Sequence, residues 1–159
     1  MGLPPSSVRR WDRCAAQGHS LFACGTLQFP EVLEVLIGRV PSQEPAAAPG
    51  CRVAALPGRI YPGLVPKSKA LTRGVVLKGL TAGEWEILDA FEDDEYDLRA
   101  TQLTNPQGPA WTYIWTAAVA QDDWYPDHFV TTRLPRFVTH CAEWRRGLEV
   151  RSDRQDSDH

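Results

Sequence analysis

A carboxylate near the middle of the chain has the surroundings of a general acid or base. In TAGEWEILDAFEDDEY, residues 81–96, helical spacing would place Trp85, Leu88 and Glu92 along one stripe. A carboxylate at the inner end of an apolar stripe is partly desolvated, and desolvation raises its pKa toward the range useful for proton transfer. The three acids that follow, at 93–95, would raise that pKa further. The alternative is an acidic helix end on a solvated surface, which this segment taken alone favours.

The stretch LFACGTLQFPEVLEVLIG, residues 21–38, holds a second candidate site. An apolar run stops at Gly25 and Thr26, and an apolar segment restarts at Pro30. Glycine lets the chain turn and lets a ligand approach the backbone, so successive N–H groups there could hold a carboxylate or a developing oxyanion. The alternative is an ordinary strand end, and the stretch by itself does not separate the two.

Cys24, at the end of the same apolar run, is a candidate nucleophile. A cysteine nucleophile needs a base within hydrogen-bond reach or a lowered pKa. No spacing in the chain brings His19, His128 or His140 beside it, so a small buried thiol is the better interpretation. The 4 cysteines are scattered, without the close pairs of a zinc or dithiol site, which predicts reduced thiols and no metal.

The elements that must position these groups begin with five short strands. Each is an apolar or alternating run bounded by turn residues. In WTYIWT, residues 111–116, the aromatic side chains would occupy one face, and the threonines and the isoleucine the other. Short strands separated by turns predict a small barrel or a curved sheet. The expected strands span 20–24, 51–56, 74–80, 98–103 and 111–117.

Three helices have recognisable ends. Pro30 suits the first helical position and Gly38 the position after the last turn. Thr81 and Glu84 form the Thr-x-x-Glu capping box of the helix that carries the candidate carboxylate. A C-terminal helix is expected to end before Gly147. Strands interleaved with few helices predict an α+β fold.

The length and composition favour one domain between two flexible ends. At 159 residues with 43% hydrophobic content, the chain is long enough for one core and short for two domains. We expect a flexible leader at 1–18, a globular domain at 19–147 and a flexible tail at 148–159. The run VPSQEPAAAPG, residues 40–50, resembles a linker and is expected to form a long surface loop.

The charge and hydropathy argue against two classes of partner. The net charge of -3 gives no broad positive field for gathering phosphates, so nucleic acid is not an expected ligand. No apolar run approaches the roughly 20 residues of a membrane-spanning helix. We therefore expect a cytoplasmic protein acting on a small molecule, with its oligomeric state left open.

Three of these segments, taken in order, resemble a known family. They are LFACGTL, GRIYPGLVP and GVVLKGLTAGEWEILDAFEDDEY. Together they resemble the γ-glutamyl cyclotransferase superfamily, most closely the branch of γ-glutamylamine cyclotransferases and plant avirulence-induced proteins, from Leu21 to about Trp144. The resemblance implies an α+β fold in which a small, mostly antiparallel β-barrel is flanked by a few α-helices.

The resemblance also implies a reaction. In this family the α-amine of a γ-glutamyl group attacks its own γ-carbonyl, which gives 5-oxoproline and releases an amine or amino acid, without a metal or organic cofactor. Proximity already favours the ring closure, so the protein must mainly hold the substrate bent and move a proton. The catalytic glutamate of the motif Leu-Asp-x-x-Glu falls on Glu92. The substrate-binding residues that the resemblance implies are Gly25, Thr26 and Leu27 through their backbone, with Tyr96, Cys24 and Tyr61 around them.

Two positions depart from the family pattern. Cys24 stands where the family usually has tyrosine, and Leu98 stands where it often has arginine. Arg99 follows one residue later, on the opposite face of a regular strand. These departures favour an alternative function, a catalytically weak or inactive binding or regulatory module on the same fold.

Overall fold

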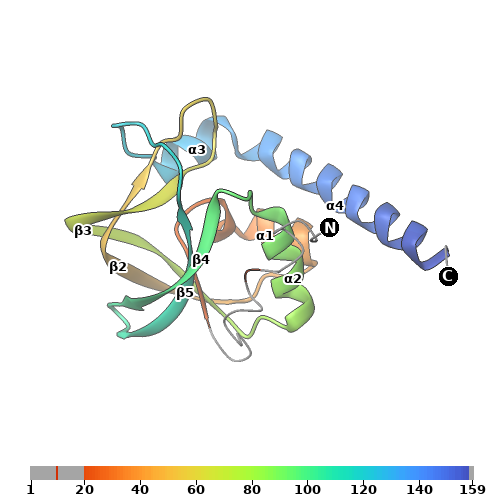
Figure 1. Cartoon of the computed structure of the whole chain (residues 1–159), viewed down its shortest axis with the longest axis horizontal. Helices are drawn as coiled ribbons and strands as arrows, with labels where there is room; N and C mark the ends of the chain where they lie inside the picture. The colour runs from red at the N-terminus through yellow and green to blue at the C-terminus, as the bar shows by residue number, and fades with distance from the viewer. Residues whose placement is uncertain (1–9, 11–19, 158–159) are drawn as a thin grey trace, which may run out of the picture.

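The backbone is built on a curled, five-stranded sheet with the strand order β2-β3-β1-β5-β4 (Figure 1). The structure is a computed structural model that describes residue 10 and residues 20–157, with side chains as far as residue 151. Strand β1 is parallel to β5, and the other neighbours are antiparallel. The strands are β1 (Leu21–Ala23), β2 (Ser42–Ala54), β3 (Gly63–Lys78), β4 (Tyr96–Leu103) and β5 (Gly108–Trp115).

This architecture confirms the α+β class and the mostly antiparallel pairing. The two edges of the sheet approach each other at a bridge between Ala47 of β2 and Thr104, just after β4, where both amides donate to the opposite carbonyl oxygen (3.0 and 2.8 Å). A closed barrel needs a continuous ladder between its first and last strands. Within the described residues the edges share only this isolated bridge, so the sheet curls like a barrel without closing.

The described chain has four α-helices, and the first two begin where the sequence signals place them. The helices are α1 (Pro30–Ile37), α2 (Ala82–Phe91), α3 (Pro126–Thr132) and α4 (Leu134–Ser157), with a 3-10 turn, η3, at Thr26–Gln28. Gly38 closes α1 in the left-handed region with φ 76°, and both hydrogen bonds of the Thr81–Glu84 capping box are present. These predicted ends are confirmed because each depends on local backbone chemistry.

The C-terminal helix is longer than predicted. Gly147 was expected to end it, yet α4 continues through the predicted tail to Ser157 and extends away from the sheet (Figure 1). A Cβ at Gly147 would have no neighbour within 4 Å, so this glycine lies in an open part of the helix. Glycine inside a helix costs roughly 1 kcal/mol, which the surrounding Arg and Glu residues can offset by their helix propensity.

The run at 40–50 is a strand and not a surface loop. Most of it belongs to β2, which pairs with β3 from Ser42 opposite Lys78 onward. Proline is tolerated there because β2 lies at the edge of the sheet, where one row of amides needs no ladder partner. The alanines at 46–48 are buried in the curl, and Gly50, with φ 78°, lies at the register shift of the strand. Composition alone therefore misidentified an edge strand.

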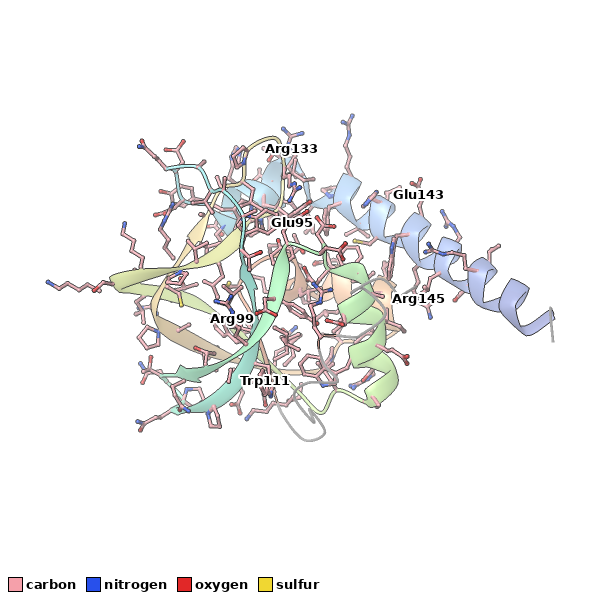
Figure 2. The ribbon with its side chains drawn as sticks, viewed as in Figure 1. Glu95, Arg99, Trp111, Arg133, Glu143 and Arg145 are labelled. Carbon is pink, nitrogen blue, oxygen red and sulfur yellow. The ribbon has the colours of Figure 1, made fainter. Side chains whose placement is uncertain are left out.

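The sheet separates two apolar clusters, and residues of β1 and β5 alternate between them. Leu21, Tyr113 and Trp115 face α1 and α2, whereas Phe22 and Ile114 face the inside of the curl. This alternation confirms the two-faced pattern predicted for residues 111–116. On the helical side, α4 packs against α1, where Nε of Arg145, labelled in Figure 2, donates to the carbonyl oxygen of Leu36 (3.0 Å). None of the helices in the described part is long and apolar enough to span a membrane.

Gly74 of β3 lies against the end of β1 and gives a first testable prediction. A Cβ at this position would lie 2.5 Å from the carbonyl oxygen of Ala23 and 2.9 Å from the ring of Phe22. We expect Gly74→Ala to lower the free energy of unfolding by about 2 kcal/mol, because β1 would have to move. Urea unfolding checks this, with Gly108→Ala as the matched control, since a Cβ there has no neighbour within 4 Å. Equal stability of the two variants would contradict the prediction.

Candidate active site

The end of β1 presents unpaired backbone amides. The chain leaves β1 at Ala23 and turns into η3, in which the amide of Gln28 donates to the carbonyl oxygen of Gly25 (3.3 Å). The first amides of a helical turn have no partner within it. Accordingly, the amides of Gly25, Thr26 and Leu27 donate to no other residue of the described chain. The break at Gly25 therefore leaves three successive N–H groups without an acceptor among the described residues.

The turn is held in place by neighbours on both sides. The Gln28 side-chain amide donates to the carbonyl oxygen of Cys24 (2.6 Å). On the other side, a Cβ at Gly25 would lie 3.0 Å from the Pro62 ring, so the backbone and that ring are closely packed. The hydroxyl of Tyr96 donates to the carbonyl oxygen of Pro62 (2.5 Å). Tyr96 therefore braces the wall that faces the turn.

Glu92 lies at the C-terminal end of α2, beside this turn. It is the C-cap residue, and its amide donates to the carbonyl oxygen of Leu88 (3.2 Å). Trp85 and Leu88 are buried on the same stripe, as the helical spacing predicted. Burial raises the pKa of Glu92 to about 8; the Arg10 cation opposes this rise, and Asp93 and Asp89 add to it. The carboxyl group thus has the proton affinity of a general acid or base near neutral pH.

The predicted residues meet at a small cavity, here called the inner cavity. Its volume is about 50 Å³, room for roughly three or four water molecules. Its wall includes Thr112 and Tyr113 of β5 as well as Pro62 and Leu64. The predicted site residues that line it are Cys24, Gly25, Thr26, Leu27, Glu92 and Tyr96.

A larger space, here called the outer cleft, opens on the other side of Glu92. It has a volume of about 560 Å³ and shares Thr26, Glu92 and Tyr96 with the inner cavity. Tyr61 lines this outer cleft, with its hydroxyl bonded to a carboxylate oxygen of Asp93. The remaining wall comes from the turn after α2 and from α4, through Asp94, Arg136, Phe137, His140 and Trp144. Glu92 therefore lies at the junction of a small inner and a large outer space.

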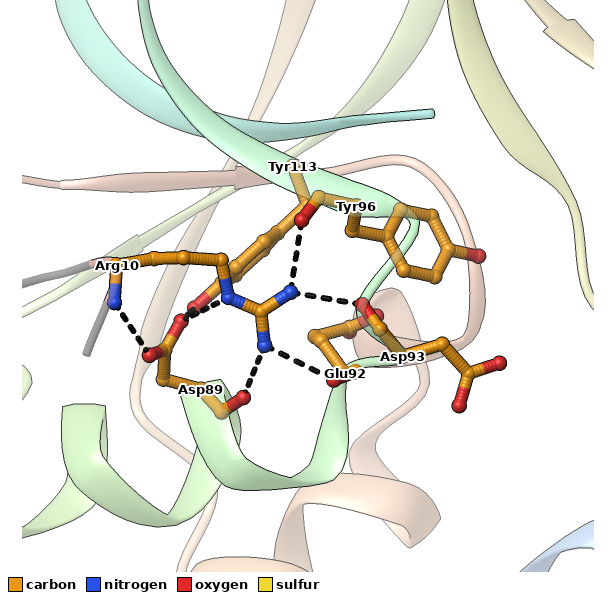
Figure 3. Close-up of polar contacts among 6 residues, drawn as sticks. All are labelled: Arg10, Asp89, Glu92, Asp93, Tyr96 and Tyr113. Atoms are coloured by element: carbon orange, nitrogen blue, oxygen red, sulfur yellow. Dashed lines mark hydrogen bonds and ion pairs between the residues drawn. The ribbon is translucent and has the colours of Figure 1, made fainter. Parts of the chain in front are cut away.

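Sequence reasoning missed the cation nearest to Glu92. Arg10 lies within the predicted leader, most of which is outside the described residues, yet its guanidinium contacts the C-terminal end of α2 (Figure 3). Its Nε pairs with the carboxylate of Asp89 (2.9 Å), which is 6% exposed. Asp89 was also missed, although an acid on the apolar side of a capped helix is a signal of a buried ion pair.

Leu98, which departs from the family pattern, lies near this ion pair. Leu98 is buried and pairs across the ladder with Tyr113, whose hydroxyl donates to Asp89 (2.8 Å). The neighbouring Arg99, labelled in Figure 2, is exposed and pairs with Asp97 (3.0 Å). The guanidinium beside Asp89 thus comes from Arg10 and not from β4.

The structure does not support Cys24 as a nucleophile. Its side chain is buried in the cluster inside the curl, and burial raises the pKa of the thiol to about 12. A thiolate is the nucleophilic form, so this environment suppresses the reactivity. His140 lines the outer cleft and not the inner cavity that Cys24 lines, and His19 lies outside the described residues. The interpretation as a buried thiol is retained.

Comparison with known proteins points to one family. The family described as Gamma-glutamyl cyclotransferase, AIG2-like matches residues 21–129. AIG2-like protein C of Arabidopsis thaliana is 40% identical over 101 residues, which are 61% of this chain and 59% of that relative, less than two thirds of its length. An Arabidopsis thaliana protein with a solution structure has a TM-score of 0.60 and 29% identity, covering 85% of this chain and 93% of its own. A solved gamma-glutamyl cyclotransferase shares the fold at a TM-score of 0.54 with 13% identity, over 62% of this chain and 67% of its own.

Proposed function

The chain belongs to the Gamma-glutamyl cyclotransferase, AIG2-like family, and from this premise we propose that it releases 5-oxoproline from a small γ-glutamyl amine or γ-glutamyl peptide. The observation that carries the proposal is the position of Glu92. A carboxyl group with a pKa of about 8 lies between two spaces. One is a cavity lined by three residues whose amides have no acceptor in the described part of the chain, and the other is a cleft with room for a leaving group. Cyclisation requires a proton carrier and an oxyanion site in this arrangement.

In the proposed reaction, the γ-glutamyl group bends into the inner cavity. The Glu92 carboxylate takes a proton from the α-ammonium group, and the free amine attacks the γ-carbonyl carbon. The carbonyl oxygen becomes negative and accepts hydrogen bonds from the amides of Gly25, Thr26 and Leu27. Glu92 then returns the proton to the leaving nitrogen as the C–N bond breaks, and the second proton that the ring nitrogen gives up passes to the released amine, which leaves in its ammonium form. The products are 5-oxoproline and a free amine, and no water is consumed.

The outer cleft is the proposed place for the leaving group. Its walls combine acids at the end of α2 with Arg136 and His140 on α4, and aromatic surface from Phe91 and Trp144. Such a mixed lining suits an amine or amino acid that carries charge and some apolar surface. Tyr61 lines the same cleft and would contact the leaving group, whereas Tyr96 would contact the reacting end. We also propose a cytoplasmic location, supported by the free thiols of the three described cysteines.

The proposal predicts a rate that rises with pH. Glu92 must be ionised to accept the first proton, and burial raises its pKa to about 8. We therefore expect kcat/KM for 5-oxoproline release to increase by about tenfold per pH unit below pH 7 and to level off above about pH 8. The measurement is a pH profile of initial rates in one mixed buffer. A rate that is flat or falls over this interval would contradict a base with this pKa.

The experiment that tests the function is a panel of γ-glutamyl donors with matched blocked donors. The panel holds γ-glutamyl amino acids, γ-glutamyl-lysine and glutathione, and each donor is paired with a form whose α-amine is acetylated. We expect 5-oxoproline only from donors with a free α-amine, because that amine is the nucleophile. If the acetylated donors release their amine or amino acid as fast as the free donors do, the reaction is hydrolysis.

The alternative function is a binding or regulatory module on the same fold. The observation that favours it is Cys24, which puts a small buried thiol beside the backbone amides of residues 25–27. Saturable binding of a γ-glutamyl donor without any product would establish this alternative, since a fold does not guarantee its reaction.

A further inference from the structure

Arg10 is joined to the segment that carries Glu92 by every N–H group of its guanidinium. Nε donates to a carboxylate oxygen of Asp89 (2.9 Å), and Nη1 donates to the carbonyl oxygens of Asp93 (2.7 Å) and Tyr96 (2.8 Å). Nη2 donates to the carbonyl oxygens of Asp89 and of Glu92 (2.9 Å). All five N–H donors of the guanidinium are thus used by acceptors on residues 89–96 (Figure 3).

Two of these bonds, to the carbonyl oxygens of Asp89 and Glu92, go to the end of helix α2. The last carbonyl oxygens of an α-helix have no intrahelical donor, and the C-terminal end carries partial negative charge. A guanidinium that bonds the carbonyl oxygens of Asp89 and Glu92 therefore closes the end of α2. The backbone amide of Arg10 donates to the second carboxylate oxygen of Asp89 (3.0 Å), and the guanidinium lies 5.3 Å from the ring centroid of Tyr113. These contacts fix the orientation of the Arg10 guanidinium.

We infer that Arg10 is a positioning residue for Glu92: its guanidinium ties the end of α2 to the start of β4 and so holds the Glu92 carboxyl at the junction of the inner cavity and the outer cleft. A residue outside the Leu-Asp-x-x-Glu block thereby becomes part of the machinery that orients its glutamate. The catalytic consequence rests on the proposed function, but the structural consequence does not.

The charge of Arg10 also acts on Glu92 directly. Burial raises the pKa of Glu92, and Arg10 is the cation that opposes this rise. Removing the cation should therefore raise that pKa further, which makes Glu92 a poorer base at neutral pH. Among the described residues, the titratable and charged groups that act on Glu92 electrostatically are Arg10, Asp89, Asp93, Tyr96, Tyr113, Cys24 and Cys141. Those that share the outer cleft with it are Tyr61, Asp93, Asp94, Tyr96, Arg136 and His140.

The test compares Arg10→Gln and Arg10→Lys in the full chain. Carboxyl-labelled glutamate followed by NMR gives the titration midpoint of Glu92, assigned by its loss in Glu92→Gln. We expect Arg10→Gln to move this midpoint to higher pH. Lysine keeps the charge, so we expect Arg10→Lys to keep the midpoint closer to that of the parent. Its three N–H donors lie on one nitrogen, however, and cannot make the five bonds of the planar guanidinium. Arg10→Lys should nevertheless accelerate amide exchange at Glu92 and Tyr96 by about tenfold.

The same variants have an expected effect on turnover. A carboxyl group displaced by about 1 Å costs on the order of 100-fold in rate, and we expect kcat of Arg10→Gln to fall by that amount. The matched control is Arg39→Gln, because Arg39 pairs with Glu84 at the opposite end of α2 (2.5 Å). This control should change neither the Glu92 midpoint nor kcat.

Two results would overturn the inference. One is an unchanged Glu92 midpoint in folded Arg10→Gln; the other is unchanged amide exchange in Arg10→Lys, which also decides the question if the glutamine variant does not fold. A parent protein without turnover would overturn the proposed function instead. In that case the NMR midpoint and the exchange rates still decide the role of Arg10.

Discussion

Glu92→Gln is expected to lower kcat for 5-oxoproline release by about 10³-fold, because an amide cannot carry the proton from the α-ammonium group to the leaving nitrogen. The side chain keeps its shape, so binding of the donor should change much less than kcat. The measurement is steady-state kinetics with the best donor of the panel. Glu95→Gln is the matched control, since Glu95 is a neighbouring acid that instead pairs with Arg59 (2.9 Å).

The same substitution is expected to stabilise the folded protein in alkaline solution. The pKa of Glu92 rises from 4.5 to about 8 on folding, so the folded state holds a proton that the unfolded chain releases earlier. The stability that this proton contributes is fully present below about pH 4.5 and is lost as the pH rises through about 8. Since Glu92 is partly exposed, we expect Glu92→Gln to gain about 2 kcal/mol at alkaline pH and little in acid.

Urea unfolding of both proteins at the two ends of this pH range checks the expected gain. A gain in stability together with lost turnover is typical of a residue kept for function at a cost in stability. If Glu92→Gln is less stable than the parent at alkaline pH, or if it turns over like the parent, Glu92 does not have the assigned role.

Asp89→Asn is expected to have the largest effect on stability, about 3 kcal/mol of lost unfolding free energy. Asp89 accepts hydrogen bonds from Nε and the amide of Arg10 (2.9 and 3.0 Å) and from the hydroxyl of Tyr113 (2.8 Å). Asparagine keeps the shape but removes the charge, and its NH₂ group would face a donor. Breaking a buried pair by removing one partner leaves the other charge without compensation.

The control for this second prediction is Asp94→Asn, an exposed acid in the same turn. It should change the free energy of unfolding by less than about 0.5 kcal/mol. Chemical unfolding at neutral pH measures both variants. Equal stability of Asp89→Asn and Asp94→Asn would mean that the Arg10–Asp89 pair contributes nothing to the free energy of unfolding. It would then not hold the end of α2 against the start of β4.

Local signals explain what could be predicted of the fold. The signals that end or begin a helix act within one turn, so they can be recognised without knowledge of the rest of the chain. Here they are Pro30, Gly38 and the Thr81–Glu84 capping box. The alternating residues of β5 likewise report which faces are buried. The strand at β2 could not be predicted because proline and alanine are disfavoured in strands generally, and their tolerance here depends on the edge position.

The candidate site likewise combines features that could be predicted with contacts that could not. The backbone turn at Gly25 and the carboxyl of Glu92 are 67 positions apart, and the resemblance placed them together where spacing could not. Arg10 was missed because nothing near it repeats at a structural period, and its contacts are with residues about 80 positions away. A long-range contact made by one side chain leaves no periodic trace in a single sequence.

Cys24 and Leu98, the two departures from the family pattern, concern the pocket and not the fold. The family fixes the fold and the class of reaction to be tested, while the departures at Cys24 and Leu98 concern the shape and charge around the substrate. Cys24 lines the inner cavity with a smaller side chain than tyrosine, and Leu98 is a buried apolar residue of β4, while the cation that pairs with Asp89 is Arg10. These differences bear on which γ-glutamyl donor fits, which the donor panel decides.

The most direct test of the central claim is the identity of the product formed in water enriched in ¹⁸O. The parent protein is incubated with a γ-glutamyl donor that has a free α-amine, and the products are analysed by mass spectrometry. Intramolecular aminolysis predicts unlabelled 5-oxoproline and the free amine in equal amounts, since no water enters the reaction. Glutamate with ¹⁸O in its γ-carboxyl group would show hydrolysis instead, and either that result or the absence of any product would contradict the proposed cyclisation.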